Sequence, residues 1–429
     1  MTSRRPLVRA AALGAAASFL LAACGSSSTP SATSSSKSDE KVTLKVNFWG
    51  DFGLKDLAPK YEAAHPNVHI QLNTGDYNAQ HDALQKSLIA GKGAPDISAI
   101  DESFVVQFKS QADKFVNILD QSDGASYASK YLDWKWKESL SADGKTQIGL
   151  GTDVGGLAMC YRTDLFKAAG LPTDRDAVSK LWPTWDAFDA IGKQYTAKTG
   201  NKFVDAATNV MNPVLAQQAT GYFDESDQLV MDQGPKAAWD ITTKFVTDKI
   251  SAGLVSFTPA WNAAFKNGKF AALACPAWMQ SYIKTQAPDA AGKWDIAAIP
   301  GGGGNWGGSF WTMPKQGTHQ KEAYEFIKWL VDPAQQLDIF KSVGNLPSQP
   351  GMYTDPALTG FTNAYFSNAP VGKIFTDAAK NLKPQYLGKK SGPVRVAVEA
   401  VLTKLEQGKT TPDAGWTEAK DAAAKAAAK

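Results

Sequence analysis

The first third of the sequence alternates between two spacings of apolar residues. In the stretch 41–50, apolar residues occupy every second position from Val42 to Phe48, which predicts a β-strand. In the stretch 54–65 they have helical spacing, and the pattern ends before Pro66. The same two patterns recur, so we expect strands over 41–50, 67–75 and 95–101 and helices over 54–65, 77–93 and 103–113. Strands that alternate with helices favour a largely parallel sheet with crossover helices.

The rest of the sequence continues this mixture with longer helices. In the helix predicted over 184–200, Thr184 is the N-cap candidate and Asp186 lies in the first turn. Further predicted elements are a strand and short helix over 156–171, a helix over 234–254, a strand and helix over 268–285, strands over 293–300 and 307–315, and a helical region over 319–344 that breaks near Pro333. The C-terminal third is expected to be helical in large part.

The first 24 residues have the pattern of an export signal. Three arginines precede an alanine-rich apolar stretch that is too short for a convincing membrane span. This stretch ends in LAAC, from Leu21 to Cys24, which resembles a bacterial lipobox. We therefore expect a signal peptide over 1–23 and a lipid-modified Cys24, with an ordinary signal peptide and an incidental cysteine as the alternative. Residues 24–40 are rich in Ser and Thr, which predicts a flexible tether that holds a globular body at the outer face of the cytoplasmic membrane, outside the cell.

The charge balance gives no sign of an acidic partner. The chain of 429 residues has 45 basic and 42 acidic side chains, and three of its arginines belong to the leader. The remaining chain is neutral, so it lacks the basic character expected of a nucleic-acid-binding protein, and an uncharged ligand is favoured. The length suits two domains.

Two cysteines remain beyond the leader, Cys160 and Cys275, each in an apolar strand-like run. An exported protein reaches a compartment where disulfides form. The two residues either form a disulfide or are both small buried apolar side chains, and the sequence leaves both possibilities open.

No set of metal ligands or catalytic residues stands out. His65 and His69 are four residues apart, but Pro66 and the following strand pattern keep them from sharing a helix face. His81 and His319 are expected on solvated helix surfaces. The sequence contains no G-x-S-x-G and no Walker A motif. We expect no catalytic residues, no metal and no cofactor.

The stretch 300–314 reads PGGGGNWGGSFWTMP and contains G-x-G-x-x-G at Gly302, Gly304 and Gly307. A dinucleotide site requires a helix directly after this motif, whereas the residues that follow it here have an extended pattern. The stretch lies between two predicted strands, so we interpret it as a strand–loop–strand connection.

Adjacent carboxylates leave one enzymatic alternative open. Asp101 and Glu102 follow a predicted strand, and Asp51 or Asp153 could supply a partner for a secreted glycosidase. Neighbouring residues of a strand point to opposite faces, which suits two-carboxylate catalysis poorly.

Aromatic and polar residues gather at the predicted ends of several strands. In open α/β sheets, ligands bind beyond the carboxyl ends of the strands. A pyranose has an apolar C–H face, on which aromatic rings stack, and a rim of hydroxyl groups for polar side chains to bind. The residues of this kind are Asn47, Trp49, Asp51, Asp101, Glu102, Asp153, Trp278, Asn305 and Trp306. Trp239 and Trp329 lie inside amphipathic helices and are expected in the core.

Several longer stretches resemble one protein family. The lipobox, the tether and the stretches VTLKVNFWGDF, YRTDLFKAAGLP, GKFAALACPAWM and HQKEAYEFIKWLVDPAQQ resemble extracellular solute-binding proteins of ABC sugar importers. The likeness covers essentially the whole mature chain. The stretches IPGGGGNWGGSFWTMPKQ and GFTNAYFSNAPVGKIF look like cellobiose- and cello-oligosaccharide-binding lipoproteins of high-GC Gram-positive bacteria. Relatives that bind other oligosaccharides keep much of this frame.

The resemblance implies an α/β fold, namely a two-lobe periplasmic-binding-protein-like clamp (type II) with a hinge. Lobe 1 would comprise residues 41–155 plus 308–345, and lobe 2 residues 156–307 plus 346–429. The chain would cross between the lobes near 151–160, 300–310 and 340–350. Sugar would lie in the cleft, and ligand contacts made only in the closed state would drive closure.

The resemblance also implies the partners and the binding residues. The protein would be a monomer without enzymatic activity that captures an oligosaccharide and presents it to the permease subunits of an ABC transporter. Trp278 matches a tryptophan that stacks on sugar in the family, and Asp101 and Asp153 match polar residues at strand ends. The loop positions that would face the cleft are Asn47, Trp49, Asn305 and Trp306. Arg395 is a weaker candidate, because its surrounding run also fits the start of a helix.

Overall fold

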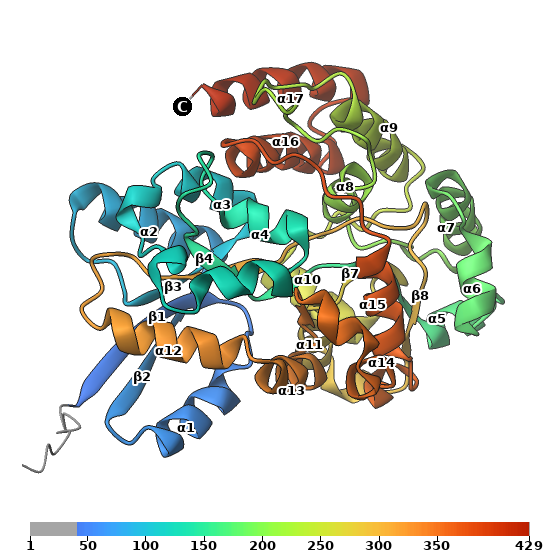
Figure 1. Cartoon of the computed structure of the whole chain (residues 1–429). Coiled ribbons are helices and arrows are strands. Elements are labelled where there is room, and N and C mark those ends of the chain that lie inside the picture. The colour runs from blue at the N-terminus through green and yellow to red at the C-terminus, as the bar shows by residue number, and fades with distance from the viewer. Residues whose placement is uncertain (1–40, 429) are drawn as a thin grey trace, which may run out of the picture. The chain divides into compact units, whose positions relative to one another are not determined.

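The computed structural model describes residues 41–428. The expected signal peptide, the lipid anchor Cys24 and the tether lie outside these residues. The strands are β1 (Val42–Trp49), β2 (Val68–Gly75), β3 (Ile97–Asp101), β4 (Gly149–Gly151), β5 (Asp153–Val154), β6 (Leu157–Arg162), β7 (Ala272–Pro276), β8 (Trp294–Ala297), β9 (Ser309–Thr312) and β10 (Leu346–Pro347). Their order along the chain follows the predicted strands closely, since the alternation of apolar residues defines both (Figure 1).

Helices occupy most of the remaining chain. The α-helices are α1 (Leu54–Ala64), α2 (Tyr77–Ala90), α3 (Glu102–Lys109), α4 (Asp133–Ser139), α5 (Thr163–Ala168), α6 (Arg175–Leu181), α7 (Trp185–Thr199), α8 (Ala207–Leu215), α9 (Gly234–Thr247), α10 (Pro259–Asn267), α11 (Met279–Gln286), α12 (Gln320–Leu330), α13 (Pro333–Val343), α14 (Pro356–Thr359), α15 (Val371–Lys380), α16 (Ser391–Glu406) and α17 (Pro412–Ala427). Within residues 41–428, no helix has both the length and the apolar character needed to cross a membrane.

Local signals in the sequence explain several helix boundaries. The Thr184 side chain accepts a hydrogen bond from the backbone N–H of Ala187, as expected of an N-cap. The break near Pro333 is the junction of α12 and α13, where Asp332 caps the second helix and the proline occupies its first turn.

The first sheet has the strand order β2-β1-β3-β9-β4. β1 is parallel to β2 and to β3, as the alternation with α1 and α2 predicts, because a crossover helix returns the chain to the same edge. The expectation of a largely parallel sheet is wrong for the other half, since β9 runs antiparallel to both β3 and β4. β9 enters this sheet directly from a loop, without a crossover helix.

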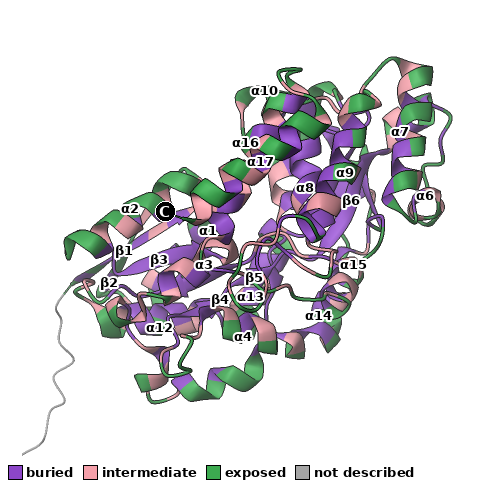
Figure 2. Cartoon of the chain, turned by 90° about the horizontal axis from the view of Figure 1, so that it is seen from above, coloured by how far each residue is buried: buried purple, intermediate pink, exposed green. Residues whose placement is uncertain are grey.

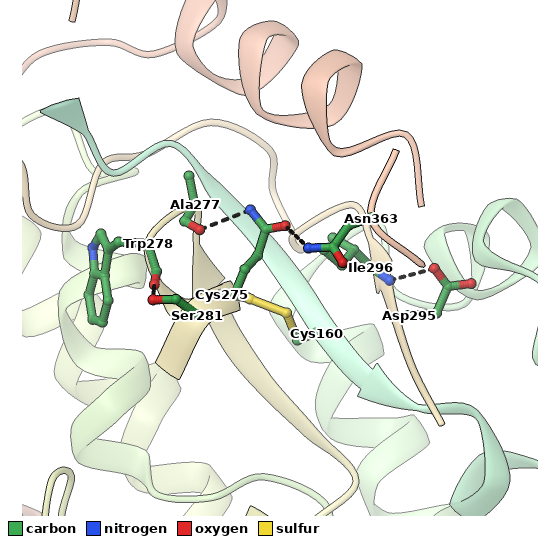
Figure 3. The surroundings of a disulfide bond; sticks show 9 residues. Cys160, Cys275, Ala277, Trp278, Ser281, Asp295, Ile296 and Asn363 are labelled. Carbon is green, nitrogen blue, oxygen red and sulfur yellow. Dashed lines mark hydrogen bonds between the residues drawn. A yellow bond between two sulfur atoms is a disulfide. The ribbon is translucent and has the colours of Figure 1, made fainter. Parts of the chain in front are cut away.

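The second sheet has the order β7-β6-β8 and is antiparallel throughout. A disulfide joins Cys160 of β6 to Cys275 of β7, with an S–S distance of 2.03 Å and a Cα–Cα distance of 5.4 Å (Figure 3). The structure thus pairs the two cysteines whose state the sequence left open.

Each sheet has its own hydrophobic core. One face of the five-stranded sheet packs against α1 and α12 through residues such as Leu57 and Phe326, and the other face packs against α2 and α3. The three-stranded sheet is covered on one side by the helices around Trp239, which is buried as predicted. Figure 2 shows the strands of both sheets as buried and the outer faces of the helices as exposed. Trp329 is only partly buried, against the first core.

Three chain segments connect the two sheets and lie side by side. Residues 153–154 and 346–347 pair as the antiparallel strands β5 and β10. The third segment joins them through the N–H of Trp306, which donates to the carbonyl of Gly155 at 2.9 Å, and through the N–H of Gly155, which donates to the carbonyl of Gly307 at 3.2 Å. These segments lie within the stretches 151–160, 300–310 and 340–350, where the resemblance implies crossings between lobes.

Candidate functional site

The end of β3 and the start of α3 position two of the expected acidic residues. Asp101 caps α3 by accepting a hydrogen bond from the N–H of Ser103 at 2.9 Å, and the hydroxyl of Tyr77 donates to the same carboxylate at 2.8 Å. Asp101 is buried, so its side chain is fixed by these two contacts before any ligand binds.

His81 contacts the backbone of Asp101. Its Nδ1 lies 2.7 Å from the carbonyl of Tyr77 and its Nε2 lies 3.0 Å from the N–H of Asp101. A carbonyl only accepts and a backbone N–H only donates, so His81 is the neutral tautomer with its proton on Nδ1. Burial lowers the pKa of His81, which favours the same form. The expectation of a solvated His81 is wrong, because α2 turns this residue inward among Trp49, Tyr77 and Phe104.

Glu102 links the five-stranded sheet to the glycine-rich crossing. Its carboxylate accepts hydrogen bonds from the N–H of Gly307, at 3.0 Å, and from the Asn305 side chain. Asn305 in turn accepts from the N–H of Gly155 at 2.8 Å. Burial, with a further contribution from the negative charge of Glu138, raises the pKa of Glu102 well above its usual value.

A buried lysine that sequence reasoning missed lies beside these residues. Lys135 of α4 is completely buried, its ammonium group is 3.3 Å from the Glu138 carboxylate, and it lies 4.0 Å from the centre of the Phe310 ring. Lysine side chains are seldom buried, so Lys135 is expected at the surface from its sequence. Its position between two tryptophans in LDWKWKES gives no sign that it belongs to the site.

Asp153 completes the acidic part of the cluster. It is buried and accepts hydrogen bonds from the Thr152 hydroxyl and, at 3.1 Å, from the N–H of Ser309. Burial raises the pKa of Asp153 and of Glu138, and the charge of Lys135 opposes this shift in both. Four carboxyl groups therefore share a small buried region with one lysine.

Arg395 reaches the cluster from α16, near the helix start that its sequence run also suggested. Its Nη2 donates to the Tyr77 hydroxyl at 3.1 Å, so arginine, tyrosine and Asp101 form a connected chain of polar groups. Lys135 and Glu138 are paired with each other at 3.3 Å, and the buried Nε of Arg395 has no hydrogen-bond partner among residues 41–428. A buried polar group without a partner is unfavourable, and Arg395 Nε can donate to a ligand that carries hydroxyls.

The aromatic residues lie on the other side of the crossing. The Trp278 Nε1 donates to the carbonyl of Trp306 at 2.9 Å, and the two rings meet edge to face with their centres 5.6 Å apart. Both tryptophans are half-buried. In Figure 3 the Trp278 indole projects away from the disulfide, beyond the end of β7. The ring of Trp49 is also half-buried and packs against Tyr77 and His81.

Two of the expected ligand-binding residues, Asn47 and Asp51, make hydrogen bonds outside the charged cluster. Asn47 accepts a hydrogen bond from Asn73 across β1 and β2 at 3.0 Å. Asp51 is exposed and accepts from the N–H of Gly53 at 2.9 Å, which stabilises the turn before α1. Neither contact involves the buried charged cluster, and ligand binding by these two residues stays a prediction.

The glycines of 300–308 allow the crossing to approach the charged cluster closely. Six of them have positive φ, from 70° at Gly302 to 124° at Gly308, a conformation that favours glycine. At Gly308 a Cβ atom would lie 2.7 Å from the carbonyl oxygen of Asp153 and 2.9 Å from Lys135 Nζ. A side chain here would therefore collide with the buried lysine, which explains the need for glycine.

The side chains of the candidate site come from two different parts of the fold. The carboxylates, Lys135 of α4 and Trp49 of β1 come from the five-stranded sheet and the elements beside it. Trp278 follows β7 of the three-stranded sheet, and Trp306 lies in the crossing. Within the described residues, no group of three or more His, Cys, Asp and Glu side chains has the arrangement of a metal site.

Two sheet-centred lobes joined by adjacent crossings, with polar and aromatic groups at the junction, define a two-lobed solute-binding protein. A family model for bacterial extracellular solute-binding proteins matches residues 56–364. This chain belongs to that family. The expected fold class is confirmed by a crystal structure of an extracellular solute-binding protein of family 1, which is 38% identical, has a TM-score of 0.78 and covers 90% of this chain and 100% of that chain.

Two relatives that are named for the sugars they bind are also similar to this chain. The arabinooligosaccharide-binding protein of Bacillus subtilis (strain 168) is 25% identical over 385 residues, which are 82% of this chain and 84% of that protein. The lactose-binding protein of Rhizobium radiobacter is 27% identical over 306 residues, which are 68% of this chain and 69% of that protein.

Proposed function

We propose that this chain is the oligosaccharide-binding component of an ABC importer. The observation that carries the proposal is the junction itself, where buried carboxylates, Lys135 and Arg395 lie next to the paired tryptophans Trp278 and Trp306. A sugar needs both kinds of group, because its hydroxyls require hydrogen-bond partners and its C–H face favours an aromatic ring. The relatives named for arabinooligosaccharides and lactose support this class of ligand.

Within this proposal the residues divide into two roles. Asp101, Glu102, Asp153, Lys135 and Arg395 bind hydroxyl groups, and Trp278 stacks on a sugar ring. Asn305 donates to Glu102, and the carbonyl of Trp306 accepts from Trp278. These two residues therefore connect the polar set to the aromatic set. Lobe 1 comprises residues 41–155 plus 308–345, and the three adjacent crossings form the hinge.

For the ligand we propose cellobiose or a longer cello-oligosaccharide. The resemblance of the stretches around 299–316 and 360–375 to cello-oligosaccharide-binding lipoproteins supports this choice. Lactose has the same β-1,4 linkage as cellobiose, so the lactose-binding relative is compatible with it. A different oligosaccharide is the alternative within the same class.

We further propose that Cys24 carries a lipid that holds the protein at the outer face of the membrane, where it meets the permease subunits. The mass of the mature N-terminal peptide tests this point. A diacylglycerol-modified cysteine is expected, and an unmodified N-terminus at Cys24 or elsewhere contradicts it.

The secreted glycosidase remains the alternative from another class. The carboxyl groups of Asp101, Glu102 and Asp153 each accept two hydrogen bonds from protein groups, which favours fixed binding groups over a nucleophile and a mobile acid. Calorimetric titration of the mature protein with cellobiose, cellotetraose, lactose and arabino-oligosaccharides separates the alternatives. We expect saturable binding and unchanged sugar after prolonged incubation, whereas hydrolysis products contradict the proposal. At a ligand concentration of about 100 times Kd, binding should stabilise the fold by about 2.7 kcal/mol.

A further inference from the structure

Phe257 combines two features that are uncommon for an aromatic residue. It lies in the loop between α9 and α10, and 55% of its surface is exposed. Its φ of 63° lies in the left-handed region, which bulky side chains rarely adopt. Strained conformations of this kind cluster at ligand-binding and switch sites, which makes the position a candidate for function.

The Phe257 ring rests on a well-anchored aromatic base. It meets the rings of Trp261 and Tyr282 edge to face, with centres 5.2 and 5.3 Å away. Trp261 is completely buried, and its Nε1 donates to Asp205 at 2.8 Å. The Tyr282 hydroxyl donates to the Asn262 side chain at 2.6 Å. The exposed ring is therefore supported from below by groups that are themselves fixed.

Phe257 also continues the aromatic side of the candidate site. Its ring is nearly parallel to that of Trp278, with an interplanar angle of 26° and centres 6.5 Å apart. Trp278 in turn contacts Trp306 at the crossing. A line of aromatic rings thus extends from the residues around Glu102 toward solvent, and Phe257 is its exposed end.

A polar group lies beside this exposed ring. The Oδ1 atom of Asn262 accepts from Tyr282, and no protein group within residues 41–428 accepts from its Nδ2. Asn262 is half-buried, so its amide group is positioned by the Tyr282 contact and can donate to a ligand oxygen. An aromatic face next to a fixed amide donor is the same combination that suits a pyranose at the main site.

We propose that Phe257 and Asn262 form an outer subsite for an additional sugar ring of a longer oligosaccharide. The C–H face of that ring stacks on Phe257, and one of its hydroxyl groups accepts from Asn262 Nδ2. This inference rests on the proposed oligosaccharide binding and adds that chains longer than a disaccharide bind more tightly. Packing against Trp261 and Tyr282 holds the Phe257 ring in place despite the unfavourable φ.

The test compares short and long sugars on matched variants. Phe257→Ala removes the ring, and Phe257→Gly removes it while accommodating the positive φ, so that at least one variant keeps the fold. Val255→Ala, at a neighbouring residue that is 40% exposed, is the control. Calorimetry gives Kd for cellobiose and cellotetraose, and for arabino-oligosaccharides of the same two lengths.

We expect both Phe257 variants to weaken binding of the four-residue sugar about tenfold, which corresponds to 1.4 kcal/mol, and to leave the disaccharide within about twofold. The Val255 control should change neither value. Unchanged affinity for the longer sugar in both Phe257 variants overturns the subsite, and an equal loss for both lengths overturns its outer position. If the unmodified protein binds neither series, the proposed ligands fail together with the subsite for them, which is a different result from a variant that has no effect.

Discussion

The two sheets of this protein supply different chemistry to their junction. The five-stranded sheet and its adjoining loops and helix contribute charged groups, namely Asp101, Glu102, Asp153 and, from α4, Lys135 with Glu138. The three-stranded sheet and its neighbours contribute rings, namely Trp278 and Phe257. The carboxylates of the first region accept hydrogen bonds from backbone N–H groups. The rings of the second region pack on one another, and Trp278 also donates to the carbonyl of Trp306.

This difference has a physical basis in how each sheet is built. β3 ends where α3 begins, so a carboxylate at that point is held by the N-terminal N–H groups of a helix. β7 instead ends in a proline and leads through Trp278 into α11, which leaves the indole to pack on other rings. A ligand that bridges the junction meets oriented polar groups on one side and flat apolar surfaces on the other.

The largest predicted effect concerns the disulfide, which is found in the three-stranded sheet. Replacing Cys160 and Cys275 together by Ser opens a loop with a sequence separation of 115 residues. Loss of a native disulfide that closes a loop of this length lowers the free energy of unfolding by about 2–5 kcal/mol. Urea unfolding of the double variant and of the oxidised protein measures this loss.

Amide hydrogen exchange shows which region the disulfide stabilises. We expect protection to fall in β6, β7 and β8 and to persist in β1 and β3, since those strands belong to a separate core. Protein treated with reductant is the matched control and should behave as the double variant does. Two free thiols in the native protein, detected by mass spectrometry, contradict the prediction.

The next prediction removes the central ring of the aromatic side. Trp278→Ala should weaken binding of every sugar that the protein binds, roughly 100-fold or about 2.7 kcal/mol, because a central aromatic contact dominates such interfaces. Trp278→Phe should lose much less. Titration calorimetry measures both variants.

Trp329→Phe is the control for this experiment, because that tryptophan is partly buried in the other core. Its affinity should equal that of the unmodified protein. If Trp278→Ala binds sugar with unchanged affinity, the indole of Trp278 only packs within the fold. The aromatic side would then take no part in sugar binding through this residue.

The sequence predicted the elements more reliably than the site. Alternating apolar residues defined β1 to β3, and the rule that ligands bind beyond strand ends pointed to Asp101 and Glu102, which the structure brings next to Asn305. The same rule also selected Asp51, whose side chain accepts a hydrogen bond within its own turn and does not join the buried cluster. A pattern along one strand identifies its end but not the direction in which each side chain projects.

Residues whose burial or exposure is the opposite of what their type favours could not be predicted from the pattern along a strand. Lys135 and His81 are polar residues on helices, and the ordinary expectation for both is exposure to solvent. Their burial results from packing between elements that are far apart in the sequence. Phe257 was missed for the opposite reason, since an aromatic residue suggests a core position and this one is exposed.

Burial also raises the pKa of two carboxyl groups away from the junction, Glu406 and Asp205. Glu406 accepts hydrogen bonds from the Ser251 hydroxyl, at 2.8 Å, and from the N–H of Ala207, and it lies among groups of the second core. Burial raises the pKa of Glu406 to about 7, with a contribution from Asp205, whose own pKa burial raises to about 6. These two groups serve the fold of the second lobe, so their titration should affect stability.

The last prediction follows from this pKa shift. The folded state holds the Glu406 proton more tightly than the unfolded chain does, in which the pKa is about 4.3. The stability that Glu406 contributes is therefore greatest below pH ~4. It is lost as the pH rises to about 7, at up to ~1.4 kcal/mol per pH unit, and does not change further above pH ~7.

Glu406→Gln keeps an acceptor for Ala207 and Ser251 but removes the titration, so the stability of the variant relative to the unmodified protein should rise between pH 4.5 and 7. Urea midpoints at pH 4.5, 6 and 8 measure this difference, with Glu418→Gln as the control, since Glu418 forms an exposed pair with Lys404. Parallel stability curves for Glu406→Gln and the unmodified protein would show that this carboxyl group titrates alike in the folded and the unfolded chain, which contradicts the prediction.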